Sequence, residues 1–320
     1  MKYIWKDMYL AGIMGILVPG LLLNVGVLAY EEEVQNQIVT EAVVITDPAM
    51  EPSVPIRLQT SSGWQEIDLE QYLIGVVLAE MPASFETEAL KAQAVVARTY
   101  TVRAQEGKSK HEGGDICGDS TCCQGYVDPA NYVGTEEDLK KVRSAVAATY
   151  GQVLTYGGAL VEATYFSCSG GTTEDAVAVW GTDVPYLQSV SSPGEENAAY
   201  YVDSVTFTSK EFTSKLGQKL EGTPTEWLGE VTYTTGGGVD AMIIGGKNYQ
   251  GTEIRKLLGL RSTAFAMEVT EGAITVTTRG YGHRVGMSQY GADAMAALGS
   301  TYREILAHYY QGTELTNWAD

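Results

Sequence analysis

Apolar side chains fill residues 72–79 almost without interruption, and this run predicts a buried helix that ends beside one acidic residue. In the run YLIGVVLA, Tyr72 carries the only polar group, and Glu80 follows it directly before Met81-Pro82. Proline pushes the residue before it out of the α region of backbone space. We therefore expect the helix to end near Glu80.

Glu80 is the candidate general acid of the chain. A carboxyl group at a helix C-terminus, half surrounded by apolar groups, meets the negative end of the helix dipole and a desolvation cost. Both effects favour the protonated carboxyl, which is the form that a general acid needs near neutral pH. The alternative is a solvated residue at a helix end, because perturbed carboxylates also occur in structural networks.

The patterns after Glu80 predict a mixed chain of helices and β-hairpins. Helical spacing predicts a helix over residues 87–105 with a narrow buried face of small residues, and another from Lys140. Alternating patterns predict one hairpin from 151–156 and 159–171, and a second from 264–269 and 273–278. Further elements are expected near 209–220 (helix), 236–238 (glycine-rich hairpin), 251–262 (basic helix), 287–298 (helix) and 301–310 (helix, with Thr301 and Glu304 as a capping box).

The first 57 residues differ from the rest of the chain. Residues 8–30 are almost uncharged and long enough to cross a membrane as a helix. Lysines precede this run and three glutamates follow it, so the positive-inside rule places the N-terminus in the cytoplasm and the remaining chain outside. We favour an uncleaved anchor over a cleaved signal peptide, because the run is longer than a usual signal-peptide core. Residues 31–57, rich in proline, predict a linker.

Composition narrows the classes of partner. The chain has 40 acidic and 21 basic residues and a net charge of -19, which argues against binding nucleic acid or an anionic lipid surface. The patterns together predict an α+β fold in which a helical catalytic segment packs with a scaffold rich in β-hairpins. We place this catalytic domain at residues 58–316, with a smaller inserted subdomain at about 202–262.

A glycine-rich loop at residues 110–126 gathers candidate metal ligands. His111, Cys117 and Cys123 follow one another at intervals of six, and Cys122 stands beside the last. Zinc favours four ligands of these types. Outside the cytoplasm disulfides compete, because the four cysteines of the chain, Cys168 included, can form two bridges. Cys122 is the least certain ligand, because adjacent cysteines do not easily bind one ion.

Other polar residues within the motif stretches are weaker candidates. His283 lies among three glycines, and Ser288 and Gln289 follow it at a predicted helix start. A serine and a histidine together suggest a hydrolase, but no acidic partner is placed by spacing, and a packing role for His283 is as good an explanation. Candidates for a sugar-binding cleft, each open to a structural explanation, are Arg98, Gln124, Tyr165 and Ser169.

Six stretches together resemble the stage II sporulation protein D family. They are YLIGVVLAEMP, EALKAQAVVARTY, CQGY, SCSGG, LGLRS and GHRVGMSQYGA with its tail REILAHYYQG, and the resemblance runs from about residue 64 to 312. It implies a lytic transglycosylase that cleaves the β-1,4 bond between N-acetylmuramic acid and N-acetylglucosamine and leaves a 1,6-anhydro end. The family's catalytic glutamate corresponds to Glu80.

The resemblance also implies partners and a cellular place. Such enzymes act on peptidoglycan strands that an amidase has stripped of stem peptides, together with membrane proteins of the engulfment machinery, between mother cell and forespore. One carboxyl group is sufficient, because the nucleophile is the substrate's own C6 hydroxyl, whereas ordinary glycosidases need two carboxylates. Some members hold zinc through a His/Cys loop, which favours zinc at His111, Cys117 and Cys123.

One departure and two alternatives remain. Arg284 stands where the family usually has glycine, and we expect it to narrow the loop or to contact an acidic partner. The first alternative is a non-catalytic relative that enhances an amidase by binding glycan or the amidase itself. The second is a zinc-dependent hydrolase that acts through the His/Cys loop.

Overall fold

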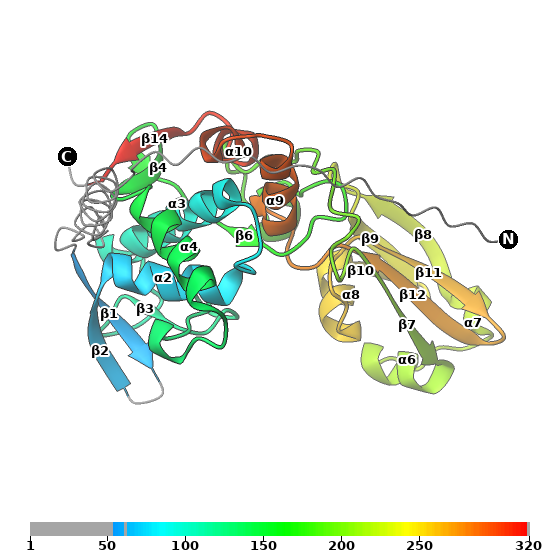
Figure 1. Cartoon of the computed structure of the whole chain (residues 1–320). Coiled ribbons are helices and arrows are strands. Elements are labelled where there is room, and N and C mark those ends of the chain that lie inside the picture. Colours follow the sequence, from blue (N-terminus) through cyan, green and yellow to red (C-terminus); the bar gives the residue numbers. More distant parts are fainter. Residues whose placement is uncertain (1–53, 61–62, 319–320) are drawn as a thin grey trace, which may run out of the picture. The chain divides into compact units, whose positions relative to one another are not determined.

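The computed structural model describes residues 54–60 and 63–318 (Figure 1). Within them, helices combine with several small sheets, so the predicted α+β class is confirmed. The predicted membrane segment at residues 8–30 lies outside the described residues. Among the helices that are described, none has both the length and the apolar character needed to span a bilayer.

The first half of the described chain builds most of the larger core. The strands β1 and β2 pair antiparallel, and β3 adds parallel to β1, beside a group of helices (Figure 1). Its elements are β1 (Pro55–Thr60), β2 (Gly63–Asp68), α2 (Leu69–Glu80), α3 (Thr87–Arg103), a π-helical turn η1 (Ala104–Lys108), β3 (Ile116–Cys117), a 3-10 turn η2 (Pro129–Asn131), α4 (Glu136–Ala147), β4 (Gln152–Tyr156), β5 (Ala159–Leu160), β6 (Tyr165–Phe166) and α5 (Ala176–Trp180).

The last elements of the chain return to this larger core. The strand β13 pairs parallel with β6, and β14 pairs antiparallel with β4. Helix α10 begins with the predicted capping box of Thr301 and Glu304 and packs against α3 and α9. These elements are β13 (Met287–Ser288), α9 (Gln289–Ala297), α10 (Tyr302–Tyr309) and β14 (Glu314–Asn317).

Helix α3 is buried over most of its circumference, rather than along the narrow face that the sequence predicts. It packs against α2, α4, α9 and α10. Its many alanines and valines let these helices approach closely, and the residues from Ala89 to Val102 are buried apart from Lys91 and Tyr100. The helix is therefore central to the larger core and fixes the helices around it.

An ion pair inside the core joins α2 to α3. Arg98 donates from Nε and Nη2 to the two carboxylate oxygens of Glu70, both at 2.7 Å, and the Arg98 side chain is 0% exposed. The same guanidinium reaches the carbonyl oxygens of Val146 and Gln152, which end α4 and begin β4. One buried cation thus fixes four elements of the helical region.

A second core is formed between residues 207 and 276. The sheet β10-β9-β8 and the sheet β11-β12-β7 pack with the helices of this region. The elements are β7 (Val202–Thr208), α6 (Ser209–Leu216), α7 (Pro224–Trp227), β8 (Leu228–Tyr233), β9 (Val239–Ile244), β10 (Lys247–Gln250), α8 (Gly251–Leu258), β11 (Phe265–Thr270) and β12 (Ala273–Arg279). Because β12 pairs with β7, this core extends beyond the predicted limit at residue 262.

Arg284 is buried and has partners within its own chain. It adopts a φ of 67°, a left-handed conformation in which a non-glycine residue is uncommon. Its guanidinium pairs with the buried Glu174 at 3.0 Å and donates to the carbonyl oxygens of Thr172 and Gly236. Gly236 lies in the turn between β8 and β9, so Arg284 bonds the second core to the segment that follows β6. The acidic partner expected from the sequence is Glu174.

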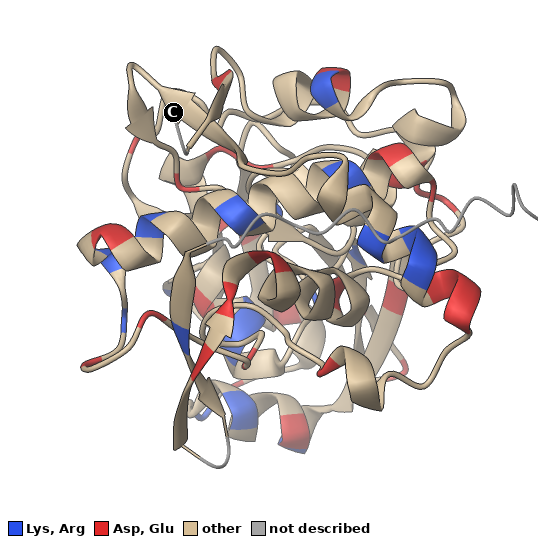
Figure 2. Ribbon diagram, turned by 60° about the vertical axis from the view of Figure 1, so that its left-hand side comes forward, with Lys and Arg blue, Asp and Glu red and all other residues tan. Residues whose placement is uncertain are grey.

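Acidic residues of the described part of the chain lie on many different elements. Figure 2 shows Asp and Glu on helices, strands and loops alike. This distribution indicates that the acidity is a general property of the described chain and does not form a binding patch for one cationic partner.

We expect Arg98→Ala to lower the free energy of unfolding by about 3–5 kcal/mol, because it leaves the Glu70 carboxylate buried without its counterion. Urea unfolding of the purified chain measures this change. The matched control is Lys91→Ala, which removes a more exposed pair with Glu88 and should cost at most about 1 kcal/mol. Equal losses for the two variants would contradict a central role for the buried pair.

Candidate functional site

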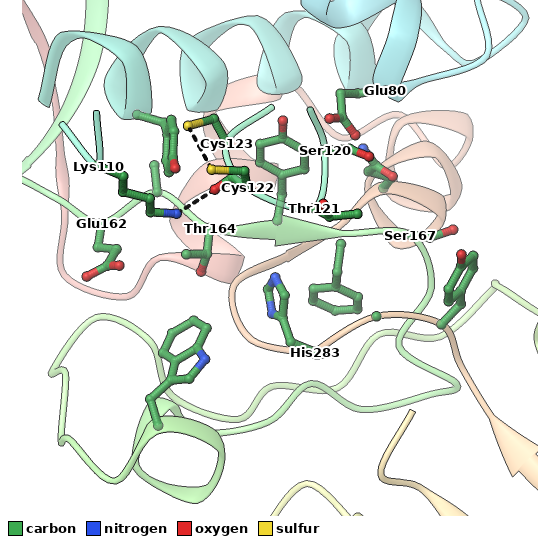
Figure 3. A pocket seen from close by; sticks show the side chains of 18 residues that line it. Glu80, Lys110, Ser120, Thr121, Cys122, Cys123, Glu162, Thr164, Ser167 and His283 are labelled. Carbon is green, nitrogen blue, oxygen red and sulfur yellow. Dashed lines mark hydrogen bonds between the residues drawn. The ribbon is translucent and has the colours of Figure 1, made fainter. Parts of the chain in front are cut away.

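A pocket of about 580 Å³ lies beside the end of α2 and is lined by Glu80 (Figure 3). Its other walls come from the loop after η1, from β6 and the residues before it, and from the glycine loop around His283. The lining residues are Glu80, Tyr100, Lys110, Ser120, Thr121, Cys122, Cys123, Glu162, Ala163, Thr164, Tyr165, Phe166, Ser167, Trp180, Tyr281, Gly282, His283 and Gln289.

Glu80 ends α2 as the sequence predicts. Met81, which precedes the proline, has extended backbone angles, and this stops the helix. The half-buried Glu80 carboxylate accepts a hydrogen bond from the backbone N–H of Gly125. A side chain at position 125 would place its Cβ 3.0 Å from Glu80 Oε1, so glycine allows the loop to approach the acid. This contact fixes one oxygen of Glu80 and leaves the carboxyl at the pocket wall.

Tyr165 lies beside Glu80 in the pocket wall. Burial raises the pKa of Tyr165 well above its ordinary range, and the neighbouring Glu80 carboxylate adds to the shift. The hydroxyl therefore stays protonated and donates to Gln124 Oε1 at 3.2 Å. Gln124 is itself fully buried and donates to Thr101 Oγ1 on α3 at 2.9 Å. Gln124 thus orients Tyr165 from behind the pocket wall.

The structure separates the predicted sugar-binding residues into two groups. Tyr165, His283 and Gln289 line the pocket with Glu80. Four others are fully buried and do not line it, so we withdraw them as residues that touch a substrate: Arg98, Gln124, Ser169 and Ser288. Each has partners in the core, and those of Arg98 and Gln124 lie far along the chain.

Ser169 and Cys168 belong to a buried network around Glu195. The Glu195 carboxylate accepts hydrogen bonds from the hydroxyls of Ser169 and Ser192 and from the backbone N–H of Ser169. The Cys168 thiol also contacts it at 3.1 Å, and burial with this carboxylate raises the thiol pKa to about 12. Ser169 therefore has a structural role, and Cys168 is an unreactive thiol. Ser288 is the N-cap of α9, where its side chain accepts from the Gly291 N–H.

His283 has both a packing role and a place at the pocket. Its ring lies between those of Phe166 and Trp180, at centroid distances of 5.6 and 5.5 Å. Burial, with a smaller effect of the Arg255 charge, lowers the pKa of His283 to about 4. The imidazole is therefore neutral near pH 7, and its Nδ1 accepts from the Val285 N–H. A hydrolase pair of Ser288 and His283 is not formed, because Ser288 caps α9.

Gln289 retains hydrogen-bonding capacity at the pocket. Its Nε2 is buried and has no hydrogen-bond partner among the described residues. A buried amide without a partner is costly, and such a group is satisfied when a ligand supplies an acceptor. Gln289 is accordingly the pocket residue with the clearest physical reason to contact a polar substrate.

The predicted metal ligands converge. One ligand atom from each of His111, Cys117, Cys122 and Cys123 lies within 4.8 Å of all the others. His111 Nε2 lies 3.3 Å from the Cys123 sulfur and 3.7 Å from the Cys122 sulfur, and these two sulfurs are 4.0 Å apart. In tetrahedral zinc sites, ligand sulfurs lie about 3.8 Å apart, and nitrogen and sulfur about 3.6 Å. The four donors fit one zinc ion.

Cys122 belongs to this cluster despite the expectation that adjacent cysteines do not share an ion. The backbone N–H groups of both Cys122 and Cys123 bond the Asp119 carbonyl, so the chain turns tightly and directs both sulfurs to one side. None of the four cysteines is in a disulfide. Burial raises the pKa of the Cys123 thiol to about 12, so its thiolate needs a nearby cation. Cys122 and Cys123 also line the pocket, which places the cluster at its wall.

Several residues that line the pocket were not predicted from the sequence. Lys110, Glu162, Trp180 and Tyr281 all line the pocket. Lys110 directly precedes His111, so its position in the predicted metal-binding loop could have marked it as a candidate site residue. Trp180 and Tyr281 carry no local pattern that separates them from core aromatics, although each is more than a third exposed.

Comparisons with known proteins identify related sequences. Residues 59–156 match the family described as Stage II sporulation protein. The chain is 44% identical over 272 residues to Stage II sporulation protein D of Bacillus subtilis (strain 168), covering 82% of this chain and 79% of the relative. The protein of the same name from Bacillus amyloliquefaciens is 42% identical, covering 82% and 78%. An Amidase enhancer of Bacillus subtilis (strain 168) is 30% identical over 77% of this chain and 40% of its own length.

The depressed pKa of His283 predicts a loss of stability in acid. The unfolded chain takes up this proton near pH 6.5, whereas the folded chain does so only near pH 4. The contribution of the neutral His283 side chain to the free energy of unfolding is therefore fully present above about pH 6.5 and is lost as the pH falls toward 4. At pH 5 the loss is about 1–2 kcal/mol.

Urea unfolding at pH 7 and pH 5 measures the effect. The decrease in the free energy of unfolding from pH 7 to pH 5 should be about 1–2 kcal/mol smaller in His283→Gln than in the native chain, because glutamine does not titrate. An equal pH dependence in the native chain and the variant would show that the imidazole does not stay neutral in the folded protein.

Proposed function

The chain belongs to the stage II sporulation protein D family, and from this premise we propose that it is a lytic transglycosylase of peptidoglycan with Glu80 as its general acid and base. It cleaves the β-1,4 bond between N-acetylmuramic acid and N-acetylglucosamine in strands free of stem peptides, and it leaves 1,6-anhydro ends. The observation that carries this proposal is the placement of Glu80 at a pocket wall, with one oxygen held by the Gly125 N–H.

The proposed reaction needs one proton carrier. In its protonated form, Glu80 gives its proton to the glycosidic oxygen as the bond to the anomeric carbon breaks. The resulting carboxylate takes the proton of the C6 hydroxyl, whose oxygen bonds the same carbon and closes the anhydro ring. The proton count of Glu80 is unchanged over the cycle. The neutral Tyr165 phenol lies beside the carboxylate and supports its orientation.

A second pocket carboxylate is less suited to the chemistry. Glu162 pairs with Arg103 at 3.5 Å, and its side chain is 44% exposed. Figure 3 shows Glu80 and Glu162 on opposite sides of the pocket. The pairing with Arg103, at the end of α3, holds Glu162 away from Glu80. A one-carboxyl mechanism therefore fits the pocket better than a glycosidase pair.

We further propose that the His/Cys cluster holds zinc with a structural or site-shaping role. Three thiolates and one imidazole complete a tetrahedral site, which leaves no open position for an activated water. When bound, the ion fixes the loop of residues 111–123. The Gly125 N–H that holds Glu80 follows this loop closely, so the ion would support the acid indirectly.

The proposed location is the cell membrane, with one N-terminal anchor and the catalytic domain in the space between mother cell and forespore. It follows from the family and from the sequence-based prediction for residues 8–30. The proposed partners are glycan strands, an amidase that removes stem peptides, and membrane proteins of the engulfment machinery.

A second candidate function is that of a non-catalytic amidase enhancer. The similarity to the Amidase enhancer favours it, although the chain covers only 40% of that protein. In this case the pocket binds glycan without cleaving it, and Glu80 is a binding group.

Replacement of Glu80 separates the two candidates. We expect Glu80→Gln to lower the release of anhydro-ended fragments from peptide-free glycan strands by at least about 100-fold, because glutamine cannot carry the proton. Mass spectrometry of the products measures this release. Glu162→Gln is the matched control and should retain activity.

Other outcomes point elsewhere. Glycan binding without fragments from the native chain would favour the amidase enhancer. Fragments with reducing ends, lost equally in Glu80→Gln and Glu162→Gln, would indicate a hydrolase with two carboxylates.

The zinc proposal predicts one zinc ion for each chain, measured by elemental mass spectrometry after dialysis. Cys117→Ser and Cys123→Ser should lose most of it, because each removes a thiolate ligand. Cys168→Ser should retain it, because this thiol contacts Glu195 rather than the cluster. Chains that hold no zinc, or that lose it equally in all three variants, would contradict the assignment.

A further inference from the structure

One cationic side chain stands in the pocket of a strongly acidic chain. Among the residues that line the pocket, Lys110 is the single lysine, and none is arginine. His283 adds no charge near pH 7, because its imidazole is neutral there. Because Glu80 and Glu162 also line the pocket, an anionic group of a ligand is attracted only at the position of Lys110.

The Lys110 ammonium group is held in place by the chain and keeps N–H donors for a ligand. Its Nζ donates to the carbonyl oxygen of Cys122 at 2.6 Å and lies 5.7 Å from the centroid of the Tyr100 ring. An ammonium group has three N–H donors, so hydrogen-bonding capacity remains for a ligand. No carboxylate of the described chain forms an ion pair with it within 4.0 Å.

The position of Lys110 separates it from bond cleavage. Figure 3 shows Lys110 and Glu80 on opposite sides of the pocket, with Cys122 between them. A cation at this place contacts a substituent of the bound ligand rather than the atoms that react at Glu80. Lys110 is therefore suited to determine which strands bind.

The aromatic part of the pocket indicates that the anionic group bound by Lys110 is carried by a sugar. Trp180 lines the same pocket and is 44% exposed, so part of its ring is open to contact with a ligand. Apolar faces of pyranose rings pack on such rings. An aromatic surface with one cation matches a saccharide that carries a carboxylate.

We propose that Lys110 binds the free lactyl carboxylate of N-acetylmuramic acid and so selects strands from which the stem peptide has been removed. The inference rests on the proposed function, because it takes peptidoglycan as the ligand. A stem peptide converts this carboxylate into an uncharged amide, which removes the partner of the ammonium group. Removal of the peptide by an amidase restores the charge that Lys110 recognises.

Binding to two matched oligosaccharides tests the proposal. The full chain with Glu80→Gln, which does not turn over, is titrated calorimetrically with a peptide-free glycan tetrasaccharide. The second ligand is the same tetrasaccharide with its lactyl carboxylates converted to methylamides. We expect Lys110→Met in this background to weaken binding of the free acid about fivefold to tenfold and to leave binding of the methylamide unchanged.

The matched control is Lys108→Met, which removes the same charge two residues away, outside this pocket. It should leave both affinities unchanged. Lys110→Arg should recover most of the preference for the free acid. Raising the salt concentration should weaken binding of the free acid to the parent more than to Lys110→Met.

Three results would overturn the inference: equal loss for both ligands in Lys110→Met, loss of bound zinc in that variant, or no preference for the free acid in the parent. The first two would make Lys110 a structural support of the His/Cys cluster. The proposed function is judged separately, by anhydro-ended products of the native chain. Release of those products together with unchanged binding in Lys110→Met would reject only the role of Lys110.

Discussion

The ion pair between Arg98 and Glu70 is the interaction on which the site depends most. It joins α2 to α3 where neither side chain meets water, and the same guanidinium bonds the carbonyls that end α4 and begin β4. Because α2 carries Glu80 at its other end, the direction of that helix determines where the acid lies. A buried pair of this kind contributes little net stability, but it strongly disfavours other arrangements of the helices.

The loop after η1 connects three parts of the site. Residues 111–123 supply the cluster of one histidine and three cysteines, Lys110 stands before them at the pocket, and Gly125 follows them against Glu80. Gln124, between the cluster and Gly125, orients Tyr165 from inside the core. A segment with little regular structure therefore sets the geometry of the acid, the phenol and the cation. Hydrogen bonds hold these positions, and an ion in the cluster would restrain the loop further.

Short sequence patterns predicted where helices begin and end. They did not predict which residues far apart in the sequence contact each other. Proline 82 gave the end of α2, and the capping box gave the start of α10, because each effect acts within a few residues. Arg98 was misplaced because its partner Glu70 lies 28 residues away and the sequence does not show that pairing. The second core extends further than predicted because β12 pairs with a strand about 70 residues earlier. Within the site, spacing and chemistry singled out Glu80, which lines the pocket, and the His/Cys residues, whose ligand atoms converge, whereas Lys110 and Trp180 are recognised only from the pocket.

Arg284 has a consequence for how the chain folds. Its guanidinium is shared between the segment after β6 and the turn between β8 and β9, and Glu174 bonds Gly238 in the same turn. Unfolding of the second core alone would leave this charged pair with unsatisfied hydrogen bonds. This pair therefore adds to the energetic coupling between the two cores. Since Arg284 directly follows His283, loss of the second core would also remove contacts that hold the pocket wall at His283.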